Sequence, residues 1–315
     1  MSLALYTKDL RKTYSGKPPV EAVRGLDLEV PVGITFGLLG PNGAGKTTTV
    51  EILEGLLEPT SGQVEVLGMS WARDGAALRE RIGVSLQETQ LAEKLTVGET
   101  VAMFASFYRA ARHPNELIEL VGLQEKRDAW VVNLSGGQKQ RLAVATSLVG
   151  DPDLLFLDEP TTGLDPQSRR QLWEVIRELK SRGRTILLTT HYMDEAERLA
   201  DLVAVVDHGR VIALGSPSEL IATLGGEHVI EFAIENDGNG DPDLSLEPLH
   251  ALPSVIGVRI EAGSVQLTVG EPHLAIPALL DHLDREQRHM TRLTTRHASL
   301  EDVFVNLTGR HLRDG

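Results

Sequence analysis

The chain contains no cysteine among its 315 residues. Disulfide bonds, thiol chemistry and cysteine-ligated metal sites are therefore excluded, and the composition suits the cytosol. No stretch approaches the roughly 18 consecutive apolar residues that a membrane-spanning helix needs, and the first residues lack the basic and then apolar pattern of a signal peptide. We therefore expect no direct insertion into a membrane, and we expect any membrane component to be a separate chain.

Positive charge is also scarce, because 31 Lys and Arg residues stand against 45 Asp and Glu residues, which gives a net charge of −14. A surface that binds nucleic acid or an anionic membrane needs clustered Lys and Arg to neutralise phosphates. We therefore expect no nucleic-acid partner. A hydrophobic content of 41% over this length supports a large core and more than one domain.

A glycine-rich loop is the most specific motif that is present. It fits the Gly-x-x-x-x-Gly-Lys-Thr template between a predicted strand at residues 34–39 and a predicted helix at residues 47–57. Backbone N–H groups of such a loop, with the helix dipole behind them, hold phosphate oxygens, whereas a merely flexible turn gives no reason for the lysine and threonine. Lys46 would reach the β- and γ-phosphates, Thr47 would suit Mg²⁺, and Thr48 would bond an α- or β-phosphate oxygen. The loop consists of Gly40, Pro41, Asn42, Gly43, Ala44, Gly45, Lys46 and Thr47.

A second motif is an apolar strand, residues 154–157, that ends in the acids Asp158 and Glu159. Continuous apolar runs are typical of buried parallel strands, and ligands of open α/β sheets bind beyond the carboxyl ends of such strands. Asp158 is then the candidate Mg²⁺ ligand, and Glu159 is the candidate general base for an attacking water. The alternative is an exposed acidic pair that only opens a loop.

The third motif opens a predicted amphipathic helix that runs to about residue 149. Its serine and its glutamine three residues later fit a capping box, so the simplest interpretation is a well-capped helix. Two glycines in the first turn destabilise a helix by about 1 kcal/mol each relative to alanine, which favours close approach of bare backbone to a further phosphate. These residues are Ser135, Gly136, Gly137 and Gln138.

With these three phosphate-binding motifs in this order, the chain resembles the nucleotide-binding subunits of ABC transporters. Residues 134–138 would then be the signature motif of that family. The resemblance covers roughly residues 3–225. It implies an α/β fold of the P-loop NTPase type, namely an ABC cassette with a mixed sheet core and a helical subdomain at about residues 88–150. It also implies an ATPase that uses ATP and Mg²⁺.

Four further residues fall where this family places functional side chains. Tyr14 matches the aromatic residue that stacks on adenine, although it is also consistent with an ordinary surface aromatic. Gln87 matches the glutamine that contacts Mg²⁺ or the attacking water and signals to the membrane partner. Asp165 matches the acid of the loop that crosses the dimer interface, and it would also begin a helix. His191, which ends a predicted strand at residues 185–190, matches the histidine that bonds the γ-phosphate.

The family also implies how two chains share the nucleotide. The signature lies too far from its own phosphate loop to touch the same ATP. Each ATP would therefore lie between Lys46 of one chain and Ser135 and Gly137 of a second, in a homodimer that forms with ATP and opens after hydrolysis.

The composition changes beyond residue 225, where there are no lysines and seven of the ten histidines. We therefore expect two domains, a nucleotide-binding domain at residues 1–225 and a small α+β accessory domain at residues 226–315. The second is expected to hold strands at residues 229–234, 255–261 and 264–269, a helix at residues 276–285, and a last helix between a Ser299 cap and Gly309.

The tail and residues 192–197 resemble drug-export ATPases of the daunorubicin-resistance type, which pair with ABC-2 permeases. The chain is thus expected to energise export of a drug-like or lipid-like compound through a separate ABC-2 permease, as a peripheral protein on the cytoplasmic face of the membrane. A soluble ABC ATPase acting on ribosomes or DNA is the alternative, but the single cassette and the acidic net charge disfavour it. A regulatory binder with an inactive site conflicts with an intact Lys46, Glu159 and His191.

Overall fold

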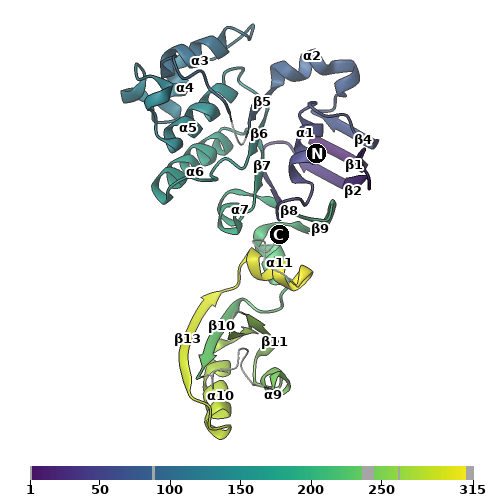
Figure 1. Cartoon of the computed structure of the whole chain (residues 1–315), viewed down its shortest axis with the longest axis vertical. Helices are drawn as coiled ribbons and strands as arrows, with labels where there is room; N and C mark the ends of the chain where they lie inside the picture. Colours follow the sequence, from purple (N-terminus) through teal and green to yellow (C-terminus); the bar gives the residue numbers. More distant parts are fainter. Residues whose placement is uncertain (1, 87–88, 236–244, 262, 310–315) are drawn as a thin grey trace. The chain divides into compact units, whose positions relative to one another are not determined.

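The structure is a computed structural model that describes residues 2–86, 89–235, 245–261 and 263–309. The chain divides into two compact units between Ser216 and Pro217 (Figure 1). This division lies before the boundary predicted after residue 225. Helix α8 (Pro217–Ala222) belongs to the second unit because it packs against α11 (Leu300–Thr308) of that unit. The first unit holds two sheets and two apolar cores, and the second unit holds one sheet with one core.

A six-stranded sheet in the order β5-β6-β7-β3-β8-β9 forms the centre of the first unit. Its strands are parallel except for β9, which pairs with β8 in an antiparallel hairpin. The strands predicted at residues 34–39, 154–157 and 185–190 are present, the last with the predicted bounds. The strands of this sheet are β3 (Thr35–Leu39), β5 (Ile82–Ser85), β6 (Leu154–Asp158), β7 (Thr185–Thr190), β8 (Leu202–Asp207) and β9 (Arg210–Gly215).

Alternate residues of the central strands face two different cores, because side chains of a strand point to opposite faces. Leu155 and Leu157 pack with a helical layer, whereas Leu154 and Phe156 pack on the other face with α1 and the first strands. Figure 1 shows the helical layer on one side of the sheet and β1, β2 and β4 on the other. The helical layer contains α3 (Val97–Ala105), α4 (Pro114–Leu120), α5 (Gly136–Ser147) and α6 (Pro166–Ser181), with short 3₁₀ turns at Gln124–Lys126 and Val131–Asn133.

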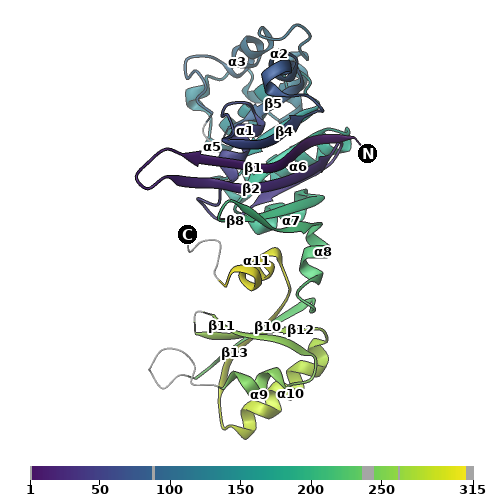
Figure 2. The ribbon, with the colours of Figure 1, turned by 90° about the vertical axis from the view of Figure 1, so that its right-hand side faces the viewer.

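The second sheet of this unit is antiparallel and joins β1 (Leu3–Tyr14), β2 (Val20–Pro31) and β4 (Ser61–Val66), the first two of which form the long ribbon in Figure 2. Helix α1 (Lys46–Leu53) ends four residues before the predicted residue 57. The chain must turn there, because Gly55 has φ 75° and a Cβ on it would lie 2.4 Å from the Trp71 ring.

Two helices of the first unit differ in how clearly their sequences predict them. Helix α2 (Trp71–Arg81) was not predicted, since Leu78 is its one fully buried residue and the segment has no apolar stripe. Helix α7 (Met193–Leu199) has the clearer signal, because its buried residues follow helical spacing. Within the described ranges, every helix is too short or too polar to cross a bilayer.

The second unit is a four-stranded antiparallel sheet in the order β11-β12-β10-β13. Apolar side chains of α9 (Leu246–His250) and α10 (Pro272–Arg285) share one core with its inner face, and the β-α-β-β-α-β order is that of a ferredoxin-like unit. Strands β10 (His228–Ile234), β11 (Val255–Glu261) and β12 (Ser264–Val269) match the prediction to within one residue.

Three parts of this unit differ from the prediction. Strand β13 (Met290–His297) was missed, because most of its residues are exposed and polar. The short helix α9 (Leu246–His250) was also missed. Helix α10 (Pro272–Arg285) begins four residues before the predicted residue 276, because the first turn of a helix accommodates a proline such as Pro272. Pro277 lies inside the helix, where proline is unusual.

A buried carboxylate holds the last helix on the sheet. Asp302 is 1% exposed and accepts hydrogen bonds from Arg296 Nη1 at 2.6 Å and Arg259 Nη2 at 2.5 Å. It also accepts from the Ser299 N–H at 2.9 Å, which completes the predicted cap, and Gly309 ends the helix with φ 70°. Burial raises the pKa of Asp302, but the hydrogen bonds from Arg296 and Ser299 and the arginine charges outweigh it and lower the pKa to about 2.

We expect Asp302→Asn to lower the free energy of unfolding by about 2 kcal/mol at pH 7, from a shift of roughly two pKa units. The folded pKa lies below the ordinary value of 3.8, so this stabilisation is fully present above about pH 4 and is lost as the pH falls through about 2. Urea unfolding of both proteins at pH 7 and pH 3 measures it, and about half of the difference should remain at pH 3. A difference that does not change with pH would contradict this assignment.

Candidate functional site

A cavity of about 790 Å³ opens at the carboxyl ends of the parallel strands. It gathers residues from the glycine-rich loop, from the segments after β6 and β7, and from β1 and β2. Nine residues predicted from the sequence line it: Tyr14, Asn42, Gly43, Gly45, Lys46, Thr47, Thr48, Glu159 and His191. Gln87 lies outside the described residues.

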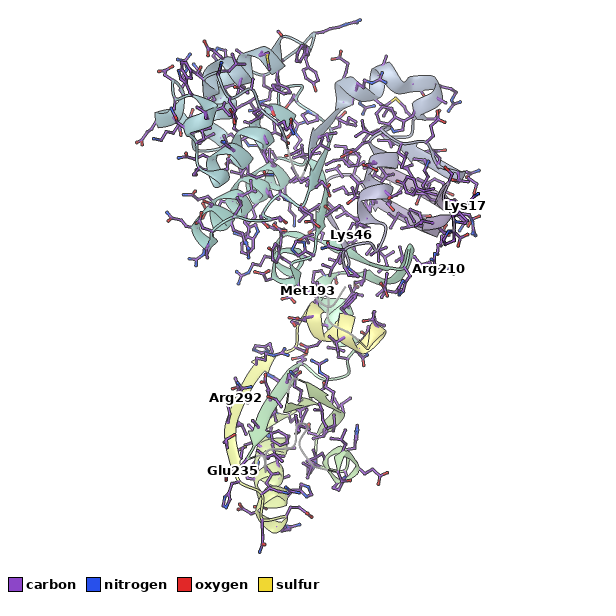
Figure 3. All side chains as sticks on the ribbon, viewed as in Figure 1. Lys17, Lys46, Met193, Arg210, Glu235 and Arg292 are labelled. Atoms are coloured by element: carbon purple, nitrogen blue, oxygen red, sulfur yellow. The ribbon has the colours of Figure 1, made fainter. Side chains whose placement is uncertain are left out.

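The lysine of the glycine-rich loop forms hydrogen bonds to the backbone of the same loop. Lys46, labelled in Figure 3, is 5% exposed, and its Nζ donates to the carbonyl oxygens of Gly40 at 2.7 Å and Pro41 at 3.0 Å. Gly45 precedes α1 with φ 98°, a conformation that glycine adopts freely. Burial lowers the pKa of Lys46, while the charges of Glu159 and Asp158 raise it. The buried ammonium therefore sits where an anion at the helix start would be stabilised.

Glu159 occupies a strained position directly after β6. Its φ is 44°, in the left-handed region that costs a residue with a side chain about 1–2 kcal/mol. The backbone N–H donates to Thr189 Oγ1 at 2.9 Å, and Thr162 Oγ1 donates to the carboxylate at 3.1 Å. His191 Nδ1 lies 3.2 Å from Oε2, and Lys46 Nζ lies 3.9 Å from Oε1. The strain thus aims this carboxylate at the lysine and the histidine of the cavity.

Thr189 holds both acids and was missed by sequence analysis. It pairs with Asp158 across β6 and β7, and its hydroxyl donates to Asp158 Oδ1 at 2.5 Å. Burial raises the pKa of Asp158, the Thr189 hydrogen bond lowers it, Glu159 raises it and Lys46 lowers it. The signal for Thr189 was present, because hydroxyls at the end of an otherwise apolar buried strand need polar partners.

Tyr14 and the turn between β8 and β9 border the same cavity. The Tyr14 hydroxyl lies 3.3 Å from Thr48 Oγ1, and its ring is 38% exposed. Arg24 and His208 also line the cavity, but neither was predicted, because β2 and the hairpin reach it only through the tertiary fold.

Gly40 and Ala44 fix the base of the loop. A Cβ on Gly40 would lie 2.2 Å from the Val206 carbonyl oxygen, and Ala44 is 3% exposed. Packing of the loop against β8 therefore requires glycine at position 40, and Ala44 is part of the buried core beneath the loop.

The signature segment lies outside the cavity. Ser135 caps α5 as predicted, since the Gln138 N–H donates to Ser135 Oγ at 3.3 Å and the Ser135 N–H donates to Gln138 Oε1 at 3.0 Å. Asp165 caps α6, accepting from the N–H groups of Gln167 at 2.9 Å and Ser168 at 3.0 Å. None of these residues lines the cavity around Lys46.

The two signature glycines have different surroundings. A Cβ on Gly137 would lie 2.3 Å from Ser168 Oγ, so packing of α5 against α6 already requires glycine there. A Cβ on Gly136 would meet nothing within 4 Å. Among the residues that the structure describes, packing gives no reason for glycine at position 136. The prediction that bare backbone contacts a phosphate therefore applies to Gly136.

These surroundings predict opposite effects on stability for two neighbouring substitutions. Gly137→Ala should lower the free energy of unfolding by about 1–3 kcal/mol through overpacking, whereas Gly136→Ala should raise it by up to about 1 kcal/mol through helix propensity. If Gly136 meets a phosphate, its alanine variant should also lose ATPase activity despite the added stability. Urea unfolding and an ATPase assay of the pair measure this, and equal stability changes would contradict the packing argument.

Comparison with known proteins places this geometry in a family. The family described as ABC transporter matches residues 23–162. The daunorubicin/doxorubicin resistance ATP-binding protein DrrA of Streptomyces peucetius is 41% identical to this chain, over 99% of this chain and 94% of its own length. This chain is an ABC transporter ATP-binding protein. A Nod factor export ATP-binding protein of Cupriavidus metallidurans is also similar to this ABC protein, at 42% identity over the full length of both.

Solved cassettes share the fold of this ABC protein. A dimeric ATP-binding cassette in a post-hydrolysis state with ADP and Pi is 26% identical with a TM-score of 0.61, covering 67% of this chain and 98% of its own. An ATP-binding subunit of an ABC transporter is 30% identical with a TM-score of 0.63, covering 70% and 93%. The predicted family and fold class are thus confirmed. As a member of the family, this ABC protein binds and hydrolyses ATP.

Proposed function

We propose that this chain energises export of a drug-like or lipid-like compound through a separate ABC-2 type membrane permease, working on the cytoplasmic face of the membrane. The support is that relatives named for drug resistance and for Nod factor export match it along essentially its whole length, including the second unit. The alternative of a soluble ATPase acting on ribosomes or DNA has no such support, and the net charge of −14 disfavours nucleic acid.

The position of Glu159 is the observation that carries the chemical part of this proposal. Its carboxylate lies at the cavity wall between His191 Nδ1 and Lys46 Nζ, at 3.2 and 3.9 Å. A carboxylate there is placed to take a proton from a water that attacks the γ-phosphate. Lys46 then stabilises phosphate charge, and His191 orients the carboxylate and bonds the γ-phosphate. Tyr14 is assigned to adenine and Thr48 to an α- or β-phosphate oxygen.

The residues around Asp158 fit a Mg²⁺ ion. The fit rests on hard oxygen donors, because Thr47 lines the cavity and Asp158 is 6% exposed with a carboxyl pKa that burial raises. A buried carboxyl of this kind gains from a nearby cation. Thr47, Asp158 and Gln87 are the proposed ligands, and the ion would neutralise phosphate charge as the bond to the γ-phosphate breaks.

We further propose that the ATP-bound state is a homodimer. Support comes from the separation of the motifs within one chain: Ser135 and Gly136 lie outside the cavity of their own Lys46. The exposed Gly136 backbone at the start of α5 is suited to an anion brought by a second chain. Ser135, Gly137, Gln138 and Asp165 are assigned to the same interface.

Transport by inside-out membrane vesicles tests the export proposal. Vesicles from the native cell and from a strain lacking this chain are given ATP outside, on the cytoplasmic face, with daunorubicin or a fluorescent phospholipid as probe. We expect ATP-dependent accumulation that the added wild-type chain restores and the Glu159→Gln chain does not. Equal accumulation without the chain, or none with either probe, would contradict the proposal.

A further inference from the structure

A second cavity, of about 480 Å³, lies between α6 and α7, away from the ATP cavity. One face of α6 supplies Arg169, Arg170, Trp173, Glu174 and Arg177, which recur at the three- and four-residue spacing of a helix face. Helix α7 supplies Asp194 and Arg198, four residues apart. Four arginines and two carboxylates therefore line a concave site, a local excess of positive charge in a chain whose net charge is −14.

The arginines of this cavity form no close ion pairs with the described residues, although the charge of Arg169 acts on a buried carboxyl: burial raises the pKa of Glu195, and Arg169 lowers it. In the part of the chain that the structure describes, none of the four forms an ion pair within 4.0 Å, whereas arginines elsewhere in the same unit, such as Arg81 and Arg184, pair with acids at 2.6 Å. The Nε of Arg169 is buried and has no hydrogen-bond partner among the described residues. The other three guanidinium groups are exposed to solvent and line the same hollow. Guanidinium groups gathered in one hollow are suited to the recognition of an anion.

Aromatic rings hold two of the guanidinium groups in place. The Arg169 guanidinium lies 4.4 Å from the Tyr192 ring centre, and that of Arg198 lies 5.3 Å from the Trp173 ring centre. Trp173 is itself fixed, because its Nε1 donates to the buried Glu195 at 3.0 Å. Stacked guanidinium groups lose less conformational freedom when they bind, so this site is organised in advance.

We propose that the cavity between α6 and α7 binds a phosphate-bearing anion. Arginine donors match phosphate oxygens in pairs, and the hollow has the volume of a small-molecule site. Arg169, Arg170 and Arg177 are the proposed ligands, and Arg198 supports them by closing over Trp173. The occupant would bridge α6, which Asp165 caps, and α7, which begins two residues after His191, so that it would join the two helices that follow these ATP-site residues.

Fluorescence of Trp173 provides a local readout of binding, because the chain has three tryptophans. The Lys46→Ala chain, which lacks the ATP-site lysine, carries Trp71→Phe and Trp130→Phe, so that Trp173 alone reports. Inorganic pyrophosphate is titrated at 0.15 M salt, and separate titrations use vesicles of phosphatidylglycerol or of phosphatidylcholine. If loss of the Trp71 hydrogen bond to Leu53 impairs folding, calorimetry of the Lys46→Ala chain replaces fluorescence.

We expect a saturable Trp173 signal that weakens at least tenfold in the Arg170→Gln, Arg177→Gln variant. Arg79→Gln, an exposed arginine of α2, is the matched control and should leave the affinity unchanged. Saturation by pyrophosphate identifies a free phosphate compound as the source, and binding of phosphatidylglycerol vesicles alone identifies a lipid headgroup. No signal with either probe, or an equal loss with Arg79→Gln, would overturn the proposal. The readout does not depend on hydrolysis, so its failure is separable from failure of the transport proposal.

Discussion

Replacing Glu159 by glutamine is expected to lower ATP turnover by about 10²- to 10⁴-fold, the range that a general base contributes. The amide keeps the size of the side chain but cannot accept the proton of the attacking water. ATP affinity should change little, because Lys46 and the loop amides supply the phosphate contacts. Phosphate release under saturating Mg-ATP and binding of a fluorescent ATP analogue separate the two effects.

Glu125→Gln is the matched control for this substitution, since that glutamate is exposed on the 3₁₀ turn Gln124–Lys126, away from the ATP cavity. Its turnover should equal that of the wild type. An unchanged rate in Glu159→Gln would remove Glu159 from the mechanism. An equal loss in both variants would mean that the assay responds to charge in general.

Gly45→Ala is expected to weaken ATP binding by at least about tenfold. The left-handed backbone costs an alanine about 1–2 kcal/mol. If the loop relaxes to relieve this strain without ATP, the cost must be met again on binding, and 1.4 kcal/mol corresponds to tenfold in affinity. A Cβ on Gly45 would also lie 2.3 Å from the Ala22 carbonyl oxygen, which is backbone of β2 and cannot swing away. The loop must therefore shift, and Lys46 and Thr47 shift with it. Titration with a fluorescent ATP analogue measures the loss.

Gly68→Ala separates the backbone cost from the overlap. Gly68 has φ 71°, and a Cβ there would meet nothing within 4 Å. Its alanine variant should lose a similar amount of folding stability from backbone strain but should bind ATP as the wild type does. If Gly45→Ala binds ATP equally well, the phosphate loop is more tolerant than its packing against β2 indicates.

The elements that position the chemistry were predictable because their signals are local. The glycine-rich loop, the strand before Asp158 and the strand before His191 each carry a spacing or an apolar run that one segment determines. Strand β13 carries no such signal, since it joins the sheet through backbone pairing with β10 and leaves most side chains exposed. Helix α2 likewise depends on contacts with other elements.

The fine structure of the site depends on contacts between distant segments. Thr189 reaches Asp158 only because β6 and β7 are neighbours in register, and Glu159 adopts its left-handed backbone only in the folded protein. Gly137 was predicted to approach a phosphate, but the close packing of Ser168 against it is by itself a sufficient reason for glycine there. Sequence spacing identified Gly137 but could not separate the two causes.

The mass of the Glu159→Gln chain, measured by light scattering with and without Mg-ATP, tests the central claim that two chains share each ATP. The account predicts a monomer without nucleotide and a dimer with ATP, and Gly136→Arg, which puts a bulky side chain on the exposed start of α5, should keep the chain monomeric. The shared site would be contradicted if the Glu159→Gln chain stayed monomeric when saturated with ATP. It would also be contradicted if a dimer formed without ATP and persisted in the Gly136→Arg variant.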